Sequence, residues 1–138
     1  MRFKLLLMLF LVSNFSFAQD QNEEQLIRET LQKYIDGSTG GQPDLLKEAF
    51  HSDLNLYYVR ANEIKVWSGS DYIADTKEGQ PTGETGRILH IDFTNDAAMA
   101  KVEISSPEME KPYIDYFMLL KSKGSWVIVH KMFTQKID

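Results

Sequence analysis

The sequence predicts an α+β domain in which helices cover one face of a curved antiparallel sheet. Two observations carry this prediction. Residues 19–50 place apolar side chains at helical spacing, whereas residues 85–138 are mainly short alternating runs separated by Asn, Asp, Gly and Ser turns. Helices and strands that occupy separate parts of a chain are typical of the α+β class. The 138 residues leave room for one modest domain.

Residues 1–18 predict a secretory signal peptide rather than part of the fold. Two basic residues precede an apolar run at residues 5–12, and small residues occupy positions 16 and 18 of the expected cleavage site. An uncleaved anchor is the alternative, but the apolar run is short for a membrane span. We therefore expect an exported protein, periplasmic or secreted, with a single mature domain over residues 19–138.

The charge and the composition limit the partners that we expect. The net charge is −5, and loss of the two basic residues of the leader makes it −7. An acidic chain without a basic cluster is a poor candidate for binding nucleic acid or, after leader cleavage, a membrane. The chain has no cysteine, so thiolate metal sites and disulfides are excluded. The three histidines, His51, His90 and His130, stand on separate elements, so we expect no metal and no cofactor.

Three helices are expected in chain order. The first covers residues 22–35 and places Ile27, Leu31 and Tyr34 on one face, with Asn22 as its N-cap and Gly37 at its end. The second runs from Pro43 to Phe50, because proline is favoured in the first turn of a helix. The third covers residues 71–76 and is capped by Ser70.

The expected strands form one hairpin and then a four-stranded meander. Their ranges are 54–60, 63–67, 87–94, 98–105, 112–121 and 126–134. The last two strands are apolar on both faces, yet only one face can pack on the helices. A second copy of the chain is the simplest cover for the other face, so we expect a homodimer.

One carboxylate interrupts the most apolar of these strands. Residues 113–120 read YIDYFMLL, with Asp115 among seven apolar or aromatic residues. A buried carboxylate destabilises a fold unless it is paired, hydrogen-bonded or protonated. Asp115 is therefore the first candidate for a functional group.

The order of elements resembles the nuclear-transport-factor-2-like superfamily, which includes SnoaL-like and ketosteroid-isomerase-like proteins. Several segments are similar to its "putative lumazine-binding" family of exported bacterial proteins. These segments are YIDG at 34–37, AFH at 49–51, GRILHID at 86–92, DAAMAKVE at 96–103, DYFMLLK at 115–121 and GSWVIVHKMF at 124–133. The resemblance implies a cone-shaped fold, in which a curved antiparallel sheet wraps around the N-terminal helices, and supports a dimer.

Comparison with ketosteroid isomerase gives Asp115 a partner. That enzyme uses a tyrosine late in the first helix and a protonated aspartic acid on a meander strand to donate hydrogen bonds to an oxyanion. Tyr34 and Asp115 occupy the similar positions here. The third member of the enzyme's site is a carboxylate base, and the corresponding position falls near Tyr58. This departure counts against isomerase activity.

The first functional hypothesis is a partly apolar pocket for a small molecule, with Tyr34 and Asp115 as its polar groups. The expected ligand-binding residues are Tyr34, Tyr58, Asp115, Phe117, Trp126, Ile128 and His130. The alternative is a filled core in which Tyr34 and Asp115 bond only each other.

Two other functions remain open. The second hypothesis is a proton-transfer enzyme, such as an isomerase, cyclase or dehydratase. In this hypothesis His130 lines the pocket as the base, and Tyr34 and Asp115 are acid or oxyanion donors. Plain alternation along 126–134 places His130 on the same face as Trp126, but a lone histidine there is more often a core residue. The third possibility is a non-catalytic interaction module that uses the apolar outer face of the sheet.

Overall fold

The computed structural model describes the backbone of residues 2–137 and the side chains of residues 19–137. Within this range the chain forms three helices and one six-stranded sheet, which confirms the α+β class. The elements are α1 (Arg2–Gly40), α2 (Pro43–Ala49), β1 (Phe50–Arg60), β2 (Glu63–Ser68), α3 (Gly69–Asp75), β3 (Thr85–Thr94), β4 (Ala97–Ser105), β5 (Tyr113–Ser122) and β6 (Ser125–Gln135). The expected signal peptide, residues 1–18, lies outside the residues whose side chains are described.

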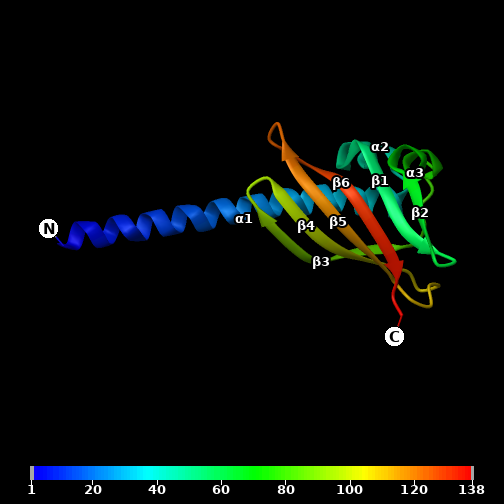
Figure 1. Ribbon diagram of the computed structural model, residues 1–138. Helices are drawn as coiled ribbons and strands as arrows, with labels where there is room; N and C mark the ends of the chain where they lie inside the picture. Colours follow the sequence, from blue (N-terminus) through cyan, green and yellow to red (C-terminus); the bar gives the residue numbers. More distant parts are fainter. Residues whose placement is uncertain (1, 138) are drawn as a thin grey trace.

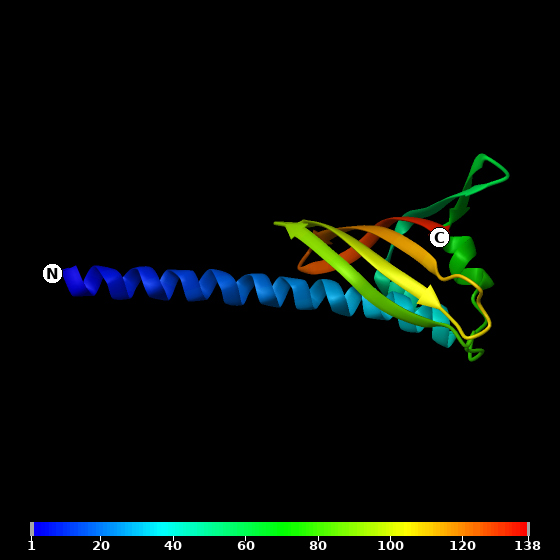
Figure 2. The same cartoon turned by 90° about the horizontal axis from the view of Figure 1, so that it is seen from below.

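The sheet has the strand order β2-β1-β6-β5-β4-β3 (Figure 1). The expected β3–β6 meander and β1–β2 hairpin are both present and antiparallel, and β1 joins them through a parallel pairing with β6. The C-terminal part of α1 packs against β3 and β6, while its N-terminal part extends away from the sheet (Figure 2). We call the face of the sheet on α1 the inner face and the opposite face the outer face.

Helix α1 is longer than the sequence predicts. It begins upstream of Asn22, so the expected N-cap is wrong, and it continues past Gly37 to Gly40. The helix ends where Gly41 takes a φ of 64° and the Gln42 N–H donates to the Gly37 carbonyl oxygen at 2.9 Å. A residue with positive φ ends the helix, and glycine adopts this conformation readily. Gly41, and not Gly37, takes this conformation, so the helix continues past Gly37.

Two other boundaries differ from the expected ones. Phe50 opens β1 rather than closing α2, because it pairs with Ile128 of β6 across a long stretch of sequence. Helix α3 begins earlier than expected, since the Ser68 hydroxyl, not that of Ser70, accepts a hydrogen bond from the Asp71 N–H at 3.1 Å. Long-range pairing therefore decides one boundary and a capping bond decides the other.

A β-bulge in β6 decides which side chains face inward near its end. Met118 pairs with His130, but the next residue of β5, Leu119, pairs with Ile128. Val129 is therefore an extra residue, and alternation changes phase after it. Ile128 and Lys131 both point inward as a result, whereas His130 points outward with Met132.

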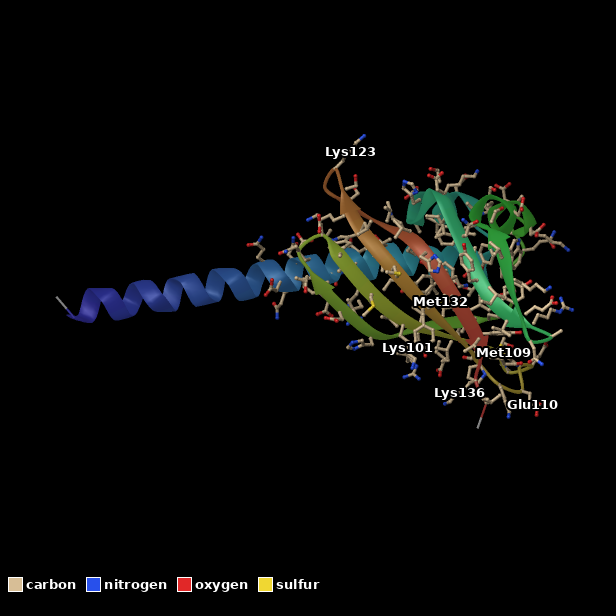
Figure 3. The ribbon with its side chains drawn as sticks, in the orientation of Figure 1. Lys101, Met109, Glu110, Lys123, Met132 and Lys136 are labelled. Carbon is tan, nitrogen blue, oxygen red and sulfur yellow. The ribbon has the colours of Figure 1, made fainter. Side chains whose placement is uncertain are left out.

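The core lies between α1 and the inner face. Ile27, Leu31, Leu56 and Ile128 are all completely buried there. The outer face is apolar and uncovered: Met99, Tyr116, Met118, Leu120 and Met132 are 42–57% exposed. Met132 and Lys101, labelled in Figure 3, stand in one cross-strand row with Tyr116 between them.

Within the part of the chain that the structure describes, no helix is both long and apolar enough to span a membrane.

Candidate functional site

Three polar side chains from three elements meet inside the core. The Tyr34 hydroxyl of α1 donates to Asp115 Oδ2 of β5 at 2.6 Å. Lys131 Nζ of β6 donates to the Tyr34 oxygen at 2.6 Å and lies 3.1 Å from the same Asp115 oxygen. We call Tyr34, Asp115 and Lys131 the buried triad. Its members form a closed triangle in which each polar group touches the other two.

The local structure explains why these side chains converge. Tyr34 lies on the apolar face of α1 that also carries Ile27 and Leu31, so its ring enters the core. Asp115 alternates inward on β5 with Phe117. Lys131 pairs with Phe117 across β5 and β6, two residues along β5 from Asp115. The bulge at Val129 is what turns Lys131 toward them.

The triad is almost inaccessible to solvent. Tyr34, Asp115 and Lys131 are 1%, 2% and 4% exposed. Burial raises the pKa of Tyr34 well above its ordinary value, and Tyr72 and the negative charge of Asp115 raise it further. Burial thus favours the protonated form of the Tyr34 hydroxyl, which donates to Asp115.

Aromatic rings enclose the Lys131 ammonium. Lys131 Nζ lies 4.7 Å from the ring centre of Tyr34, 5.1 Å from that of Phe133 and 5.3 Å from that of Tyr72. The ring of Phe117 follows at 5.8 Å. The faces of aromatic rings attract cations, so these rings partly replace the water that burial removes.

A cavity of about 270 Å³ adjoins the triad. Its lining consists of the triad, an aromatic wall and a few polar groups at the margin: Tyr34, Ser38, Trp67, Tyr72, Glu84, Ile104, Tyr113, Asp115, Lys131 and Phe133. A second cavity of about 340 Å³ shares Ser38, Trp67, Tyr72 and Glu84 with it and extends toward residues 75–82. The two cavities are neighbours with four lining residues in common, and we call them together the cleft.

The loop at the outer end of this cleft is tied to the C-terminal end of α1. The Gly79 N–H donates to the Gly41 carbonyl oxygen, and the Thr82 N–H donates to that of Thr39, both at 2.9 Å. A Cβ atom on Gly41 would lie only 2.7 Å from the carbonyl oxygens of Lys77 and Gln80. The loop at 76–84 is therefore an anchored wall of the cleft.

The structure brings only some of the expected ligand-binding residues to the cavity. Tyr34 and Asp115 line it and bond each other, as expected. Phe117 is packed edge-on against Tyr34, with ring centres 4.8 Å apart, but it lies behind the triad rather than on the cavity wall. Tyr58 stacks on Phe133 with ring centres 4.8 Å apart, one residue removed from the cavity.

Trp126 and Ile128 are core residues at the opposite end of the inner face. Ile128 is completely buried, and neither side chain lines the cleft. The Trp126 indole N–H donates to Glu23 at 3.0 Å, and Lys121 Nζ contacts the same carboxylate at 2.6 Å. These bonds lower the pKa of Glu23. Trp126 therefore helps to fix α1 on the sheet.

The expected orientation of His130 is wrong. The bulge at Val129 places it on the outer face, where its ring stacks on Tyr57 with centres 4.9 Å apart. His130 lines an outer-face cavity of about 510 Å³ and not the cleft. The expected donor role of Asp115 is also wrong in this structure, because Asp115 accepts a hydrogen bond from the Tyr34 hydroxyl and pairs with the Lys131 cation.

Lys131 is the site residue that sequence reasoning missed. Plain alternation assigned Lys131 to the outer face, where a lysine is an ordinary solvent-exposed residue. The signal that points to it is the need of a buried Asp115 for a cation. Among the described residues no group of three His, Cys, Asp or Glu side chains is arranged to hold a metal ion.

Similar proteins of known structure share this fold. An NTF2-like protein of unknown function from Shewanella baltica OS155 is 25% identical, with a TM-score of 0.72 over 85% of this chain and 96% of its own. One from Silicibacter pomeroyi DSS-3 is 21% identical, with a TM-score of 0.73 over 85% and 98% of the two chains. The cone-shaped nuclear-transport-factor-2-like fold expected from the sequence is thus confirmed.

One relative of the chain carries the name of an enzyme. Aldolase FrzH from a Cladobotryum species is 29% identical over 115 residues, which cover 81% of this chain and 90% of that protein. The profile of the family described as "Putative lumazine-binding" matches residues 22–134, which include every member of the buried triad. The chain is therefore a member of that family, within the nuclear-transport-factor-2-like superfamily.

Proposed function

We propose that the protein binds a small, partly apolar molecule in the cleft and holds a carbonyl oxygen of that molecule on Lys131. The observation that carries the proposal is a buried ammonium group at the wall of an aromatic cavity. Membership of a family described as lumazine-binding supports a small-molecule ligand. Tyr34 and Asp115 position the ammonium group and balance its charge.

The hydrogen bonds of Lys131 leave a donor for the ligand. An ammonium group has three N–H donors. The Tyr34 oxygen accepts one of them, and Asp115 Oδ2 lies 3.1 Å from Nζ as its partner in an ion pair. Among the residues that the structure describes, Lys131 Nζ makes no further hydrogen bond, so we infer that an N–H remains available to an acceptor in the cavity.

The charge balance favours an uncharged acceptor. Lys131 and Asp115 together carry no net charge, and Tyr34 is neutral. A carboxylate ligand would add an uncompensated negative charge to a buried site, whereas a carbonyl group would not. The aromatic wall of Trp67, Tyr72 and Phe133 suits a flat apolar body beside that carbonyl.

The test is ligand binding with a variant that lacks the polar groups. Lumazine and benzamide are the probes, and isothermal titration measures their affinity for the purified protein. We expect Asp115→Leu/Lys131→Met to weaken binding by roughly 10- to 100-fold, since a hydrogen bond to a charged group contributes about 1.5–3 kcal/mol. Lys121→Met, whose lysine lies outside the cleft, is the matched control. Equal binding by the wild type and the double variant would refute the proposal.

Carbonyl chemistry in the same cleft is the second candidate function. The buried triad contains groups that can move protons, and a relative that is 29% identical is named an aldolase. The base is not His130, which lies on the outer face. Exchange of the α-protons of a ketone for solvent deuterium, measured by NMR, tests this function. Exchange that survives Asp115→Leu/Lys131→Met would exclude the triad.

We also propose that the outer face forms a homodimer. Its uncovered apolar side chains include Tyr116, Met118 and Met132, each at least 42% exposed. A contiguous apolar patch of this kind is typical of a protein interface. Light scattering coupled to gel filtration should give twice the monomer mass for the wild type and the monomer mass for Met118→Glu. A monomeric wild type at micromolar concentration would contradict this proposal.

Export is the remaining proposal. The apolar run at residues 5–12 and the small residues at positions 16 and 18 support cleavage after residue 18. N-terminal sequencing of the protein from cell fractions should find Gln19 first, outside the cytoplasm. Recovery of the intact N-terminus in the cytoplasmic fraction would contradict the proposal.

A further inference from the structure

We propose that Lys131 forms an imine with an uncharged ketone or aldehyde in the cleft, an inference that rests on the proposed function. The same contacts that present an N–H to a carbonyl oxygen also bring the lysine nitrogen close to the carbonyl carbon. Lys131 is 4% exposed and is surrounded by Tyr34, Asp115 and aromatic rings. A lysine removed from water in this way is the usual kind of amine nucleophile in proteins.

An imine needs the free amine, and the triad contains the group that can take the proton. Asp115 Oδ2 lies 3.1 Å from Lys131 Nζ, which allows direct transfer between them. Transfer of one proton from Lys131 to Asp115 neutralises both groups and leaves no net charge in the buried site. The Tyr34 hydroxyl bonds the same Asp115 oxygen and keeps it in place.

The covalent step balances with groups that are present. The nitrogen lone pair attacks the carbonyl carbon while Asp115 gives the proton that it took from Lys131 to the carbonyl oxygen, and the nitrogen returns one of its protons to Asp115, which gives a carbinolamine. Asp115 then protonates the hydroxyl group, which leaves as one molecule of water, and takes the last proton of the nitrogen. The product is an imine between Lys131 Nζ and the former carbonyl carbon, and no oxidant or reductant takes part.

The surroundings select the carbonyl compound by charge and size. The imine and the protonated Asp115 are both neutral, so a 2-oxo acid would leave an unpaired carboxylate in the cavity. Glu84 at the margin of the same cavity would repel that carboxylate as well. The volume of about 270 Å³ beside the triad admits a compact body against Phe133 and Tyr72. We therefore expect small uncharged ketones or aldehydes to react and 2-oxo acids to fail.

Acetylacetone is the probe for this reaction, because its adduct with an amine is a stable enaminone that absorbs in the near ultraviolet. We expect Lys131 to form the adduct at least about tenfold faster than any other lysine of the purified protein, since it is desolvated and oriented. Mass spectrometry of the peptides should show the mass of the diketone minus one water on Lys131. Pyruvate with borohydride should leave Lys131 unmodified.

Three variants separate the chemistry from folding. Lys131→Arg keeps a cation beside Asp115 but cannot form the enaminone, so the near-ultraviolet band should disappear while circular dichroism stays unchanged. Asp115→Asn removes the proton acceptor and should slow the adduct at least about tenfold. Lys121→Arg changes a lysine that is bonded to Glu23, away from the cleft, and should react like the wild type.

Benzamide distinguishes failure of this inference from failure of the proposed function, because an amide accepts a hydrogen bond but forms no imine. If benzamide binds and acetylacetone gives no adduct on Lys131, the imine is refuted and the binding function stands. If neither probe engages the cleft, both are refuted. An adduct spread evenly over surface lysines, or one that persists in Lys131→Arg, also overturns the inference.

Discussion

The ion pair between Asp115 and Lys131 makes a quantitative prediction about stability. Removing either partner leaves the other as an unpaired charge in a site that is at most 4% exposed. Two unit charges 3.1 Å apart attract each other by about 5 kcal/mol at an effective dielectric constant of about 20. We therefore expect Asp115→Leu and Lys131→Met each to lower the free energy of unfolding by about 3–5 kcal/mol.

The double variant Asp115→Leu/Lys131→Met should be more stable than either single variant. It buries no unpaired charge, and apolar replacements of a buried ion pair are often neutral or stabilising. Its remaining defect is the Tyr34 hydroxyl, which loses Asp115 and Lys131 as partners, at a cost of about 1–3 kcal/mol. The two substitutions should thus show a coupling free energy of at least about 3 kcal/mol.

Urea unfolding at pH 7 measures all four proteins, and equal slopes against urea concentration show that the unfolding reaction is the same. Tyr34→Phe, added to the double variant, should recover part of the remaining loss. The reasoning is refuted if each single variant loses less than about 1 kcal/mol, or if the two losses simply add.

Three further predictions test other parts of the structure. The exchange variant His130→Lys/Lys131→His keeps the composition but removes the cation from the core. Urea unfolding should show that the free energy of unfolding falls by about 3–5 kcal/mol. An unchanged free energy of unfolding would contradict the bulged register. In Gly86→Ala the new Cβ atom would lie 2.5 Å from the Ile35 side chain. Thermal unfolding should show that the free energy of unfolding falls by about 1–3 kcal/mol, and Ile35→Ala should partly restore it. A Gly86→Ala variant as stable as the wild type would exclude that close contact. The pKa of Glu23 is lowered by Lys121 and Trp126, so the stability that Glu23 contributes is complete above the pKa of the unfolded chain and is lost as the pH falls through the lower pKa of the folded state. The free energy of unfolding should therefore fall less between pH 7 and pH 3 in Glu23→Gln than in the wild type. Equal decreases would argue against the hydrogen bonds of Glu23 to Lys121 and Trp126.

The sequence predicts the elements of this fold well because their signals are local. Ile27, Leu31 and Tyr34 repeat at helical spacing, and all three are buried on α1. The apolar residues of both faces of β5 likewise predict an uncovered sheet surface, and Met118 and Leu120 are indeed about half exposed. Element type and the apolar face follow from such spacing without knowledge of the partner strand.

The boundaries and the site depend on contacts that no local pattern contains. Phe50 is a helix residue by spacing, but it becomes a strand residue because it pairs with Ile128. The phase change at Val129 belongs to the pairing of β6 with β5, so plain alternation places His130 inward and Lys131 outward. One extra residue in one strand thus reverses the assignment of two candidate groups while leaving the fold unaltered.

Lys131 also changes what the comparison with ketosteroid isomerase implies. That site needs an aspartic acid that keeps its proton and donates it as a hydrogen bond. Here an ammonium group lies 3.1 Å from the Asp115 oxygen that already accepts a hydrogen bond from Tyr34. The contacts of this Asp115 oxygen are therefore with protein groups. The donor that we propose for a ligand is therefore an N–H of Lys131, and the position of the enzyme's base falls near Tyr58. In the proposed site, Tyr34 and Asp115 keep the positions of the enzyme's pair but orient Lys131, and this lysine of the neighbouring strand meets the ligand in their place.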